Sequence, residues 1–95
     1  MGVNLGKENK MTHPEIAAYF EEIVWIAENL KKVDTLFEMF PLSEKLTDDY
    51  QTFRAWALDE VEASRKAETF AEALECLEEA RGCIYRCREV LDLAE

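Results

Sequence analysis

Apolar residues recur at helical spacing through the last third of the chain, from Thr69 to Ala94. At about 100° per residue they occupy a sector wider than the roughly 100° that a surface helix needs. Thr69 and Glu72 have the spacing of a capping box, so we expect the helix to begin there. The pattern predicts a central helix that contacts two or three neighbours. Its apolar side comprises Phe70, Ala73, Leu74, Cys76, Leu77, Ala80, Cys83, Ile84, Cys87, Val90, Leu91 and Ala94.

Another helix is predicted to begin at Thr12, where Glu15 completes a second capping box and Pro14 suits the first turn. Trp25 falls about 180° from the apolar seam of this helix, on a polar side. We consider two interpretations of Trp25: a tertiary contact with residues 33–46, or an anchor for a partner or a second copy, since Trp is enriched at binding hot spots. The seam comprises Ile16, Phe20, Ile23, Ala27 and Leu30, with Tyr19 and Ile26 on one flank.

Residues 33–46 are too apolar for a free loop. Asp34 can cap a short helix there and Pro41 can stop it. The next helix is predicted over residues 47–66. No Gly or Pro separates it from the following helix, so a continuous helix is the alternative, but the capping box at Thr69 favours a break near residues 66–69. The seam of the 47–66 helix comprises Leu46, Tyr50, Phe53, Ala57, Val61 and Ser64, with Trp56 on its flank.

Together these patterns predict the fold class. We expect an all-α protein, an antiparallel helical bundle of three main helices plus a short connecting helix. Residues 12–95 are expected to form a single helical-bundle domain, and the polar residues 1–11 a disordered N-terminal tail. The three seams should share one core that includes Phe20, Ile23, Phe53, Ala57, Leu74, Leu77, Ile84 and Leu91.

The charge balance narrows the classes of partner. The chain has 95 residues, with 21 acidic against 11 basic residues and a formal net charge of −10. Direct binding to nucleic acid or to an anionic membrane is disfavoured, because both depend on Lys and Arg that meet phosphates. A basic protein partner is favoured instead. We find no signal-peptide pattern and no apolar run of the roughly 20 residues that span a membrane, so we expect a cytoplasmic protein.

Few residues could carry out chemistry. His13 is the only histidine and lies at a helix start, so neither a catalytic triad nor a di-iron bundle with Glu-x-x-His motifs has a basis here. Cys76, Cys83 and Cys87 share the apolar side of one helix, where they cannot pair with each other in good geometry. We expect reduced, buried thiols, because a structural zinc site needs four ligands. The prediction is therefore no enzyme, no cofactor and no metal.

One short pattern resembles the motifs of an enzyme family. The segments Glu72-x-x-Glu75, or Glu75-x-x-Glu78, and then Glu89-x-x-Asp92 resemble the paired ExxE and ExxD motifs of the all-α nucleotide pyrophosphohydrolases. The resemblance implies Mg²⁺ held by these carboxylates. A Mg-dependent pyrophosphohydrolase is our remote alternative.

A second resemblance concerns the C-terminal helix. Its EA dipeptide, followed by Tyr85-Arg86 and then by Leu91 and Leu93, resembles the last helix of small four-helix-bundle proteins of the ribosomal intervening-sequence kind. Members of that group form rings and bind partners through charged surfaces. The resemblance implies a self-assembling structural or accessory subunit, which is our main alternative function.

Acidic residues collect opposite the apolar side of the 69–94 helix. Between Ala67 and Ala80 there are five acids and no base, namely Glu68, Glu72, Glu75, Glu78 and Glu79. Like charges in such a row repel by a few tenths of a kcal/mol per pair, so folding gains nothing from them. They either keep the protein soluble or contact a basic partner. Gly82, on the same outer side, is either neutral or allows another backbone to approach closely.

We therefore expect a non-enzymatic, small acidic helical protein-binding module. Its sharpest form is an inhibitor of the phage counter-defence type, which presents a nucleic-acid-like acidic face to a basic, nucleic-acid-binding protein. The predicted partner-binding residues are the five glutamates and Trp25. A homodimer with Trp25 near the contact is a further expectation, because Trp25 faces away from its own seam and three helices give the 69–94 helix few neighbours for its wide apolar side. A second copy would supply them, and closed two-fold symmetry is the commonest form of oligomer.

Overall fold

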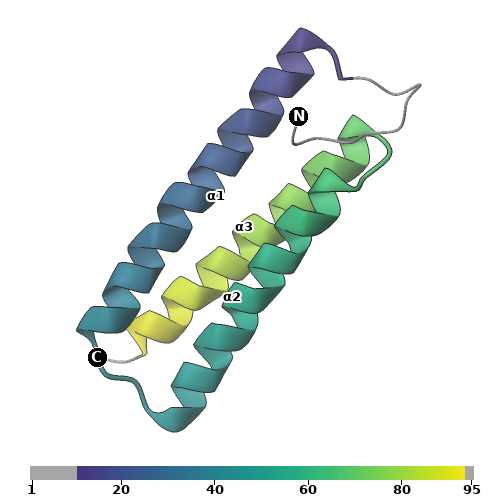
Figure 1. The fold of residues 1–95 in the computed structure, drawn as a ribbon. Helices are drawn as coiled ribbons and strands as arrows, with labels where there is room; N and C mark the ends of the chain where they lie inside the picture. The colour runs from purple at the N-terminus through teal and green to yellow at the C-terminus, as the bar shows by residue number, and fades with distance from the viewer. Residues whose placement is uncertain (1–10, 94–95) are drawn as a thin grey trace.

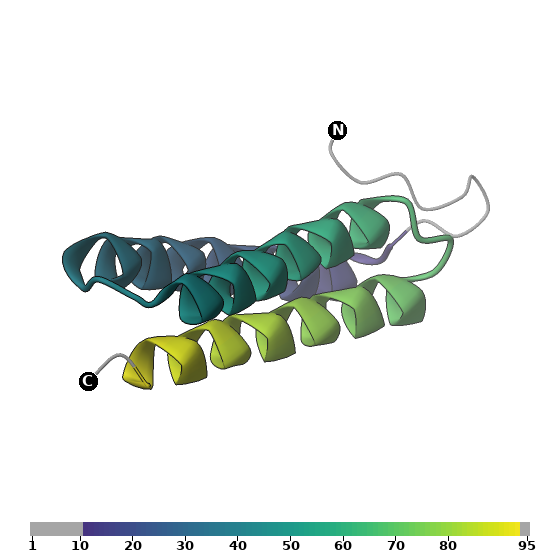
Figure 2. The same cartoon turned by 90° about the horizontal axis from the view of Figure 1, so that it is seen from below.

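Three helices make up the part of the chain that the computed structural model describes, residues 11–93. They are α1 (His13–Met39), α2 (Glu44–Arg65) and α3 (Phe70–Asp92), and no strand occurs among these residues. The chain reverses direction at both connections (Figure 1), and Figure 2 shows the three helices packed side by side. The Cα atoms extend over 48 × 18 × 18 Å. The predicted all-α helical bundle is confirmed.

Each helix begins at a hydroxyl side chain that caps its free amides. Thr12 and Glu15 form the predicted capping box at α1, in which each side chain accepts a hydrogen bond from the other residue's backbone amide. Ser43 caps α2 by accepting from the amide three residues on, at 3.2 Å. Thr69 caps α3 in the same way, at 3.1 Å. The break between α2 and α3 therefore falls at residues 66–69, as the sequence predicts.

The expected short connecting helix is not a separate element. Residues 33–39 are the last turns of α1, and residues 40–43 link α1 to α2. Asp34 does not cap a helix, because its carboxylate accepts hydrogen bonds from Arg54 of α2 at 2.9 and 2.8 Å. The α1 helix ends at Met39, and its C-cap Phe40 has the extended backbone (φ −121°, ψ 122°) that the following Pro41 favours. The predicted tail of residues 1–11 lies outside the described residues, except for Met11, which packs partly against the core.

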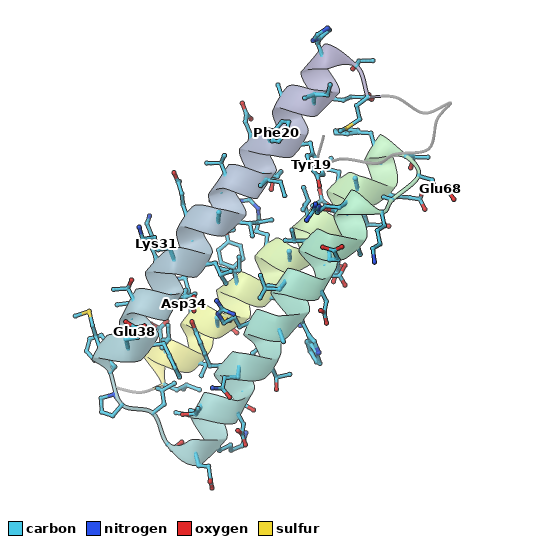
Figure 3. The ribbon with its side chains drawn as sticks, viewed as in Figure 1. Tyr19, Phe20, Lys31, Asp34, Glu38 and Glu68 are labelled. Atoms are coloured by element: carbon cyan, nitrogen blue, oxygen red, sulfur yellow. The ribbon has the colours of Figure 1, made fainter. Side chains whose placement is uncertain are left out.

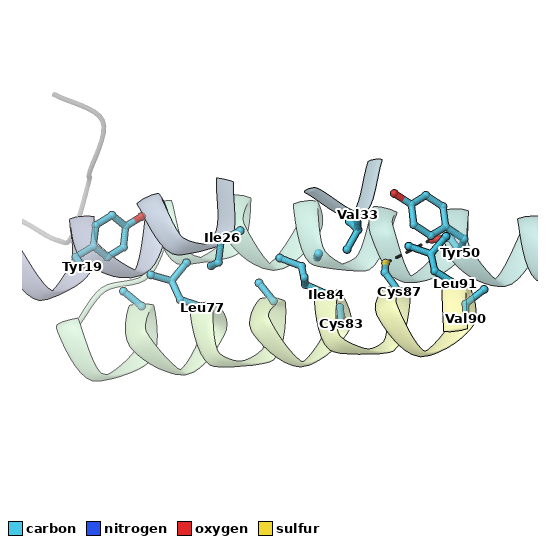
Figure 4. Close-up of a cluster of buried hydrophobic side chains, with 13 residues drawn as sticks. Tyr19, Ile26, Val33, Tyr50, Leu77, Cys83, Ile84, Cys87, Val90 and Leu91 are labelled. Carbon is cyan, nitrogen blue, oxygen red and sulfur yellow. Dashed lines mark hydrogen bonds between the residues drawn. The ribbon is translucent and has the colours of Figure 1, made fainter. Parts of the chain in front are cut away.

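Buried residues recur with the seven-residue period of a coiled coil. On α1 they are Tyr19, Ile26 and Val33, and on α2 they are Tyr50, Ala57 and Ser64. On α3 the central row alternates steps of four and three residues through Ala73, Leu77, Ala80, Ile84, Cys87 and Leu91. Figure 4 shows the apolar members of these rows meeting in one core.

The buried side of α1 is rotated by about one residue from the predicted seam. Tyr19 and Ile26 are buried, whereas Phe20 is 51% exposed and Ala27 is exposed, so the predicted seam is wrong at these positions. Apolar residues occupy both sets of positions, and the periodicity alone could not choose between them. The observed rotation brings the Tyr19 hydroxyl within 2.9 Å of the buried Ser64 hydroxyl. Of the other predicted core residues, Ala57, Leu77, Ile84 and Leu91 are buried, and Ile23, Phe53 and Leu74 are partly buried.

Candidate partner-binding surfaces

The five glutamates predicted as the partner contact, Glu68, Glu72, Glu75, Glu78 and Glu79, are all exposed. Glu72 accepts a hydrogen bond from the Thr69 hydroxyl at 3.2 Å. None of the five forms an ion pair with any residue of the described range 11–93. Glu68 lies at an outer edge of the bundle, beside the start of α3 (Figure 3). Most of this carboxylate charge is therefore open to solvent.

These glutamates do not form one strip along α3. Arg81 and Tyr85 contact α1, and Glu78 precedes them by three and seven residues, so helical spacing puts Glu78 on the α1 side of the helix. Glu72 and Glu79 lie on the side that faces α2, where their charges act on the thiols of α3. The predicted row is thus divided between two sides of α3.

A further carboxylate, Glu60 of α2, joins the glutamates on the α2 side. Burial raises the pKa of the Cys76 thiol, and the charge of Glu60 and its hydrogen bond to that thiol raise the pKa further. The charges of Glu75 and Glu72 add smaller effects in the same direction. Glu60 could not be predicted from the sequence, because only the packing of α2 on α3 brings it beside Cys76. We call Glu60, Glu68, Glu72, Glu75 and Glu79 the acidic face.

An exposed tryptophan borders the acidic face. Trp56 precedes Glu60 by one helical turn on α2 and is 49% exposed. Its ring packs edge to face on Phe53, with centroids 5.7 Å apart, and the Arg86 guanidinium lies 5.9 Å from the Phe53 ring. From the helical pattern, Trp56 was predicted only to lie on the flank of its seam. The four-residue spacing of Trp56 and Glu60 could have predicted that the two side chains lie on the same side of α2.

Trp25, the other predicted contact residue, is half-buried against α3. The Arg81 guanidinium lies over its ring, 3.9 Å from the centroid, and the Tyr85 ring lies 5.6 Å away. Glu22 fixes Arg81 through hydrogen bonds of 2.9 and 3.0 Å. The expected contact with residues 33–46 is therefore wrong, because the rotation of α1 turns Trp25 towards α3. What remains exposed beside it is Tyr85, at 48%.

The three thiols differ in burial. Cys83 and Cys87 are buried as predicted, whereas Cys76 is only partly buried, so that prediction is wrong for Cys76. Burial raises the pKa of Cys87 to about 12, and its thiol points at the Tyr50 carbonyl oxygen, 3.8 Å away. Burial also raises the pKa of Cys83. Thiolate chemistry is therefore suppressed at all three cysteines.

The carboxylate pairs that resemble a magnesium site lie far apart. Glu72 and Glu75 are in the first turns of α3, and Glu89 and Asp92 are in its last turns. Corresponding members of the two pairs are seventeen residues apart along the helix, which corresponds to about 25 Å. Within residues 11–93 no group of three or more His, Cys, Asp or Glu side chains is placed to hold a metal ion. His13 is the exposed first residue of α1.

A polar network joins α1 to α2. The hydrogen bonds from Arg54 hold the pKa of the Asp34 carboxyl below its ordinary value, and the Tyr50 hydroxyl also donates to this carboxylate. Burial raises the pKa of Tyr50, whose ring stacks on Phe37 with centroids 4.4 Å apart. These side chains and Leu58 line an open groove of about 370 Å³. Because the network's polar groups bind each other, we interpret it as structural.

Comparison with protein-family models, with curated proteins and with solved structures finds no match to this chain. Within the described range, none of the three helices combines the length and the apolar character that crossing a membrane requires. The surfaces themselves are therefore the basis for a functional proposal.

Proposed function

We propose that this protein is a non-enzymatic protein-binding module whose acidic face contacts a basic protein partner. The observation that carries the proposal is the set of exposed glutamates on α3 that have no ion pair among the described residues. Trp56 supplies what charge alone lacks, an exposed aromatic ring beside the carboxylates. Aromatic anchors carry much of the affinity at interfaces, whereas charges mainly set specificity and association rate.

The spacing of the acidic face favours a partner that binds one nucleic-acid strand. Glu72, Glu75 and Glu79 span about 10 Å of α3, which gives one charge per roughly 5 Å, and Glu68 lies in the connection just before the helix. A single strand of a duplex carries one charge per about 3.4 Å of axis. Glu60 of α2, which lies beside Cys76 and Cys83, adds a fourth carboxylate over about the same length, so the acidic face carries one charge per roughly 3.5 Å, close to that of one strand. The more specific proposal is that the partner is a nucleic-acid-binding protein and that this module inhibits it.

The test compares two variants with the same net charge. Glu72→Gln, Glu75→Gln and Glu79→Gln together neutralise the acidic face, whereas Glu21→Gln, Glu28→Gln and Glu38→Gln neutralise exposed acids of α1. Wild-type protein and both variants are immobilised, exposed to native lysate and eluted with rising salt. We expect the first variant to lose proteins that the wild type and the second variant retain. Equal capture by both variants would show that only net charge matters and would refute the proposed site.

Trp56→Ala separates recognition from simple ion exchange. The ring is half exposed and packs on Phe53 alone among the aromatic side chains, so its removal should change stability little. If Trp56 is an interface anchor, the variant loses captured partners while keeping all its carboxylates. If Trp56→Ala retained every partner, Trp56 would not be an interface anchor, and binding would depend on charge alone.

Self-assembly as a structural or accessory subunit is the second candidate. The observation that favours it is the exposure of large apolar residues on α1 and α2, namely Phe20 and Val24 at 51% and Leu58 at 42%. A second copy could cover them, and a homodimer would be the simplest closed form. Light scattering at high micromolar concentration tests this candidate, and a strict monomer would eliminate it. The remote pyrophosphohydrolase alternative would require carboxylates from two copies to meet. The free thiols favour a cytoplasmic location under either candidate.

A further inference from the structure

Three cationic side chains differ from the other described Lys and Arg residues in their lack of side-chain partners. The other described Lys and Arg residues are engaged, Lys45, Arg54, Arg65, Lys66 and Arg81 in ion pairs and Arg86 with the Phe53 ring. By contrast, Lys31, Lys32 and Arg88 form no ion pair and no side-chain hydrogen bond with residues of the described range. This is notable in a chain with 21 acidic and only 11 basic residues, where carboxylates are plentiful.

These three cations line the same groove. It is formed by α1 and α3, has a volume of about 410 Å³, and is completed by Val33, Thr35 and Leu36. We call it the cationic groove. No carboxylate is among its lining residues. The Thr35 hydroxyl donates to the Lys31 carbonyl oxygen at 2.9 Å, so the cations are the groove's free side-chain donors. Its volume lies within the range of about 300–1,000 Å³ that is typical of small-molecule sites.

The walls of the cationic groove are apolar. Val33 is 1% exposed and forms the floor of the groove, whereas Leu36, which packs only partly against the core, presents alkyl surface to it. The methylene stems of Lys31 and Lys32 add to this apolar surface while their ammonium groups stay in water. A ligand that matches these walls and these charges has a negative head and an alkyl body. We propose that the cationic groove binds an organic anion of the fatty-acid class, with its carboxylate among Lys31, Lys32 and Arg88.

The proposed site is independent of the acidic face. Lys31 lies on the side of α1 that faces away from α2, and Glu68 lies at the opposite edge of the bundle (Figure 3). The net charge of −10 opposes the approach of any anion. At physiological ionic strength, however, charges farther away than about 8 Å are largely screened, so the field in the groove depends mainly on nearby groups, and its lining has three cations and no carboxylate. Failure of the acidic-face proposal would leave this site unaffected.

Three probes of matched structure test the ligand class on the full-length protein. Decanoate has both the head and the body, decanol has the same chain without the charge, and acetate has the charge without the chain. In NMR titrations of ¹⁵N-labelled protein, we expect decanoate to shift the backbone amides of Lys32, Leu36 and Arg88. We expect decanol and acetate to bind at least about tenfold more weakly, because each lacks one of the two contributions.

Two triple variants test the position of the site. Lys31→Gln, Lys32→Gln and Arg88→Gln together should weaken decanoate binding by about tenfold or more, since each exposed charge pair contributes a factor of up to about five. The control, Lys45→Gln, Arg65→Gln and Lys66→Gln, removes three exposed cations elsewhere and should leave decanoate binding within about twofold.

Several results would overturn the proposal. Equal weakening in both triple variants would show a general charge effect. Binding of decanol as tight as that of decanoate would show that the cations play no part. Shifts centred on Phe20, Val24 and Leu58 would place the alkyl chain on the exposed apolar residues of α1 and α2 instead. The comparison of probes on the wild-type protein remains decisive even if a variant fails to fold.

Discussion

The two ways in which helices are joined in this protein differ in kind. The α2 and α3 helices form the most extensive interface, and its buried positions include the small residues Ala57, Ala73 and Ala80. The Cys87 thiol even reaches the Tyr50 backbone carbonyl oxygen of α2. The α1 helix, by contrast, is joined to its neighbours largely through long side chains. Their contacts are Tyr19 with Ser64, Asp34 with Arg54, Phe37 with Tyr50, Glu22 with Arg81, and Trp25 with Tyr85.

This difference follows from side-chain volume. Small side chains let two helix backbones approach, so many weak dispersion contacts replace a few strong ones. Long polar and aromatic side chains span a wider separation, and each contact then depends on hydrogen-bond geometry and on charge. We therefore expect the α2–α3 interface to be sensitive to side-chain volume. The attachment of α1 should instead be sensitive to pH and to the loss of single polar groups.

The largest expected effect comes from a cavity in the core of α3. Leu77 is fully buried, and Leu77→Ala should lower the free energy of unfolding by about 2–5 kcal/mol. For a domain of this size, that corresponds to a fall in melting temperature of about 10 °C or more. Leu58→Ala is the matched control, because Leu58 is 42% exposed and should change stability by less than about 1 kcal/mol. An unchanged melting temperature for Leu77→Ala would place Leu77 outside the core.

The next largest effect on stability should come from overpacking the core. Overpacking also tests which face of α1 is buried, the observed one or the one predicted by periodicity. Ala80 is fully buried, so Ala80→Leu should destabilise the protein by about 1–3 kcal/mol. Ala27 belongs to the predicted seam but is exposed, so Ala27→Leu should stay within about 0.5 kcal/mol of wild type. Chemical denaturation of both variants measures the difference. A large loss of unfolding free energy for Ala27→Leu would show that Ala27 is buried, as the predicted seam requires.

The sequence predicted the starts of α1 and α3 and the core of α3, because these depend on local information. The predicted start of α2 at residue 47 was wrong, because Ser43 caps a helix that begins at Glu44. Thr12, Thr69 and the four–three spacing of α3 each carry their signal within a few residues. The rotation of α1 was not predictable from periodicity, because apolar residues stand both at Tyr19 and at Phe20. The observed rotation of α1 depends on a contact between residues 45 positions apart, the Tyr19 and Ser64 hydroxyl groups. The extension of α1 through Asp34 was missed for the same reason, since the partner of Asp34 is Arg54 on α2.

The candidate surfaces show the same division between local and distant information. The glutamates of α3 are neighbours in sequence, and their exposure follows from the helical wheel. Glu60 and Trp56 join them only because α2 packs on α3. The cationic groove brings Arg88 of α3 beside Lys31 and Lys32 of α1, which no local pattern could indicate. Sequence periodicity therefore reveals surfaces on one helix, whereas sites between helices require the packing.

A smaller effect is expected where α1 is attached to α2 through Asp34 and Arg54, and it should depend on pH. Because Arg54 lowers the pKa of Asp34 in the folded state, the ionised carboxylate stabilises the fold at neutral pH. This stabilisation is fully present above the ordinary carboxyl pKa of 3.8 and is lost as the pH falls through the lower folded pKa. We expect Asp34→Asn to lower the free energy of unfolding at pH 7 by about 1 kcal/mol, a modest value because both side chains are about one-third exposed.

The measurement is urea denaturation of wild type and Asp34→Asn at pH 7 and at pH values below 3.8. The difference between them should shrink in acid, where the wild-type carboxylate is itself protonated. Asp49→Asn is the control, since within residues 11–93 Asp49 pairs only with Lys45, which is 82% exposed, and its removal should matter little. A difference that stays constant with pH would show that the Asp34–Arg54 ion pair does not hold α1.

The smallest effect concerns Gly82, on the side of α3 that belongs to neither interface. A Cβ atom at this position would meet nothing within 4 Å, so the fold itself gives no reason for a glycine there. Gly82→Ala should therefore raise the free energy of unfolding by up to about 1 kcal/mol, through the better helix propensity of Ala. If a second copy packs its backbone against Gly82, the same variant lowers the mass seen by light scattering while the melting temperature of the monomer rises. A variant that gains stability and keeps the wild-type mass would show that Gly82 serves no close contact, and that this side of α3 is plain solvent-facing helix.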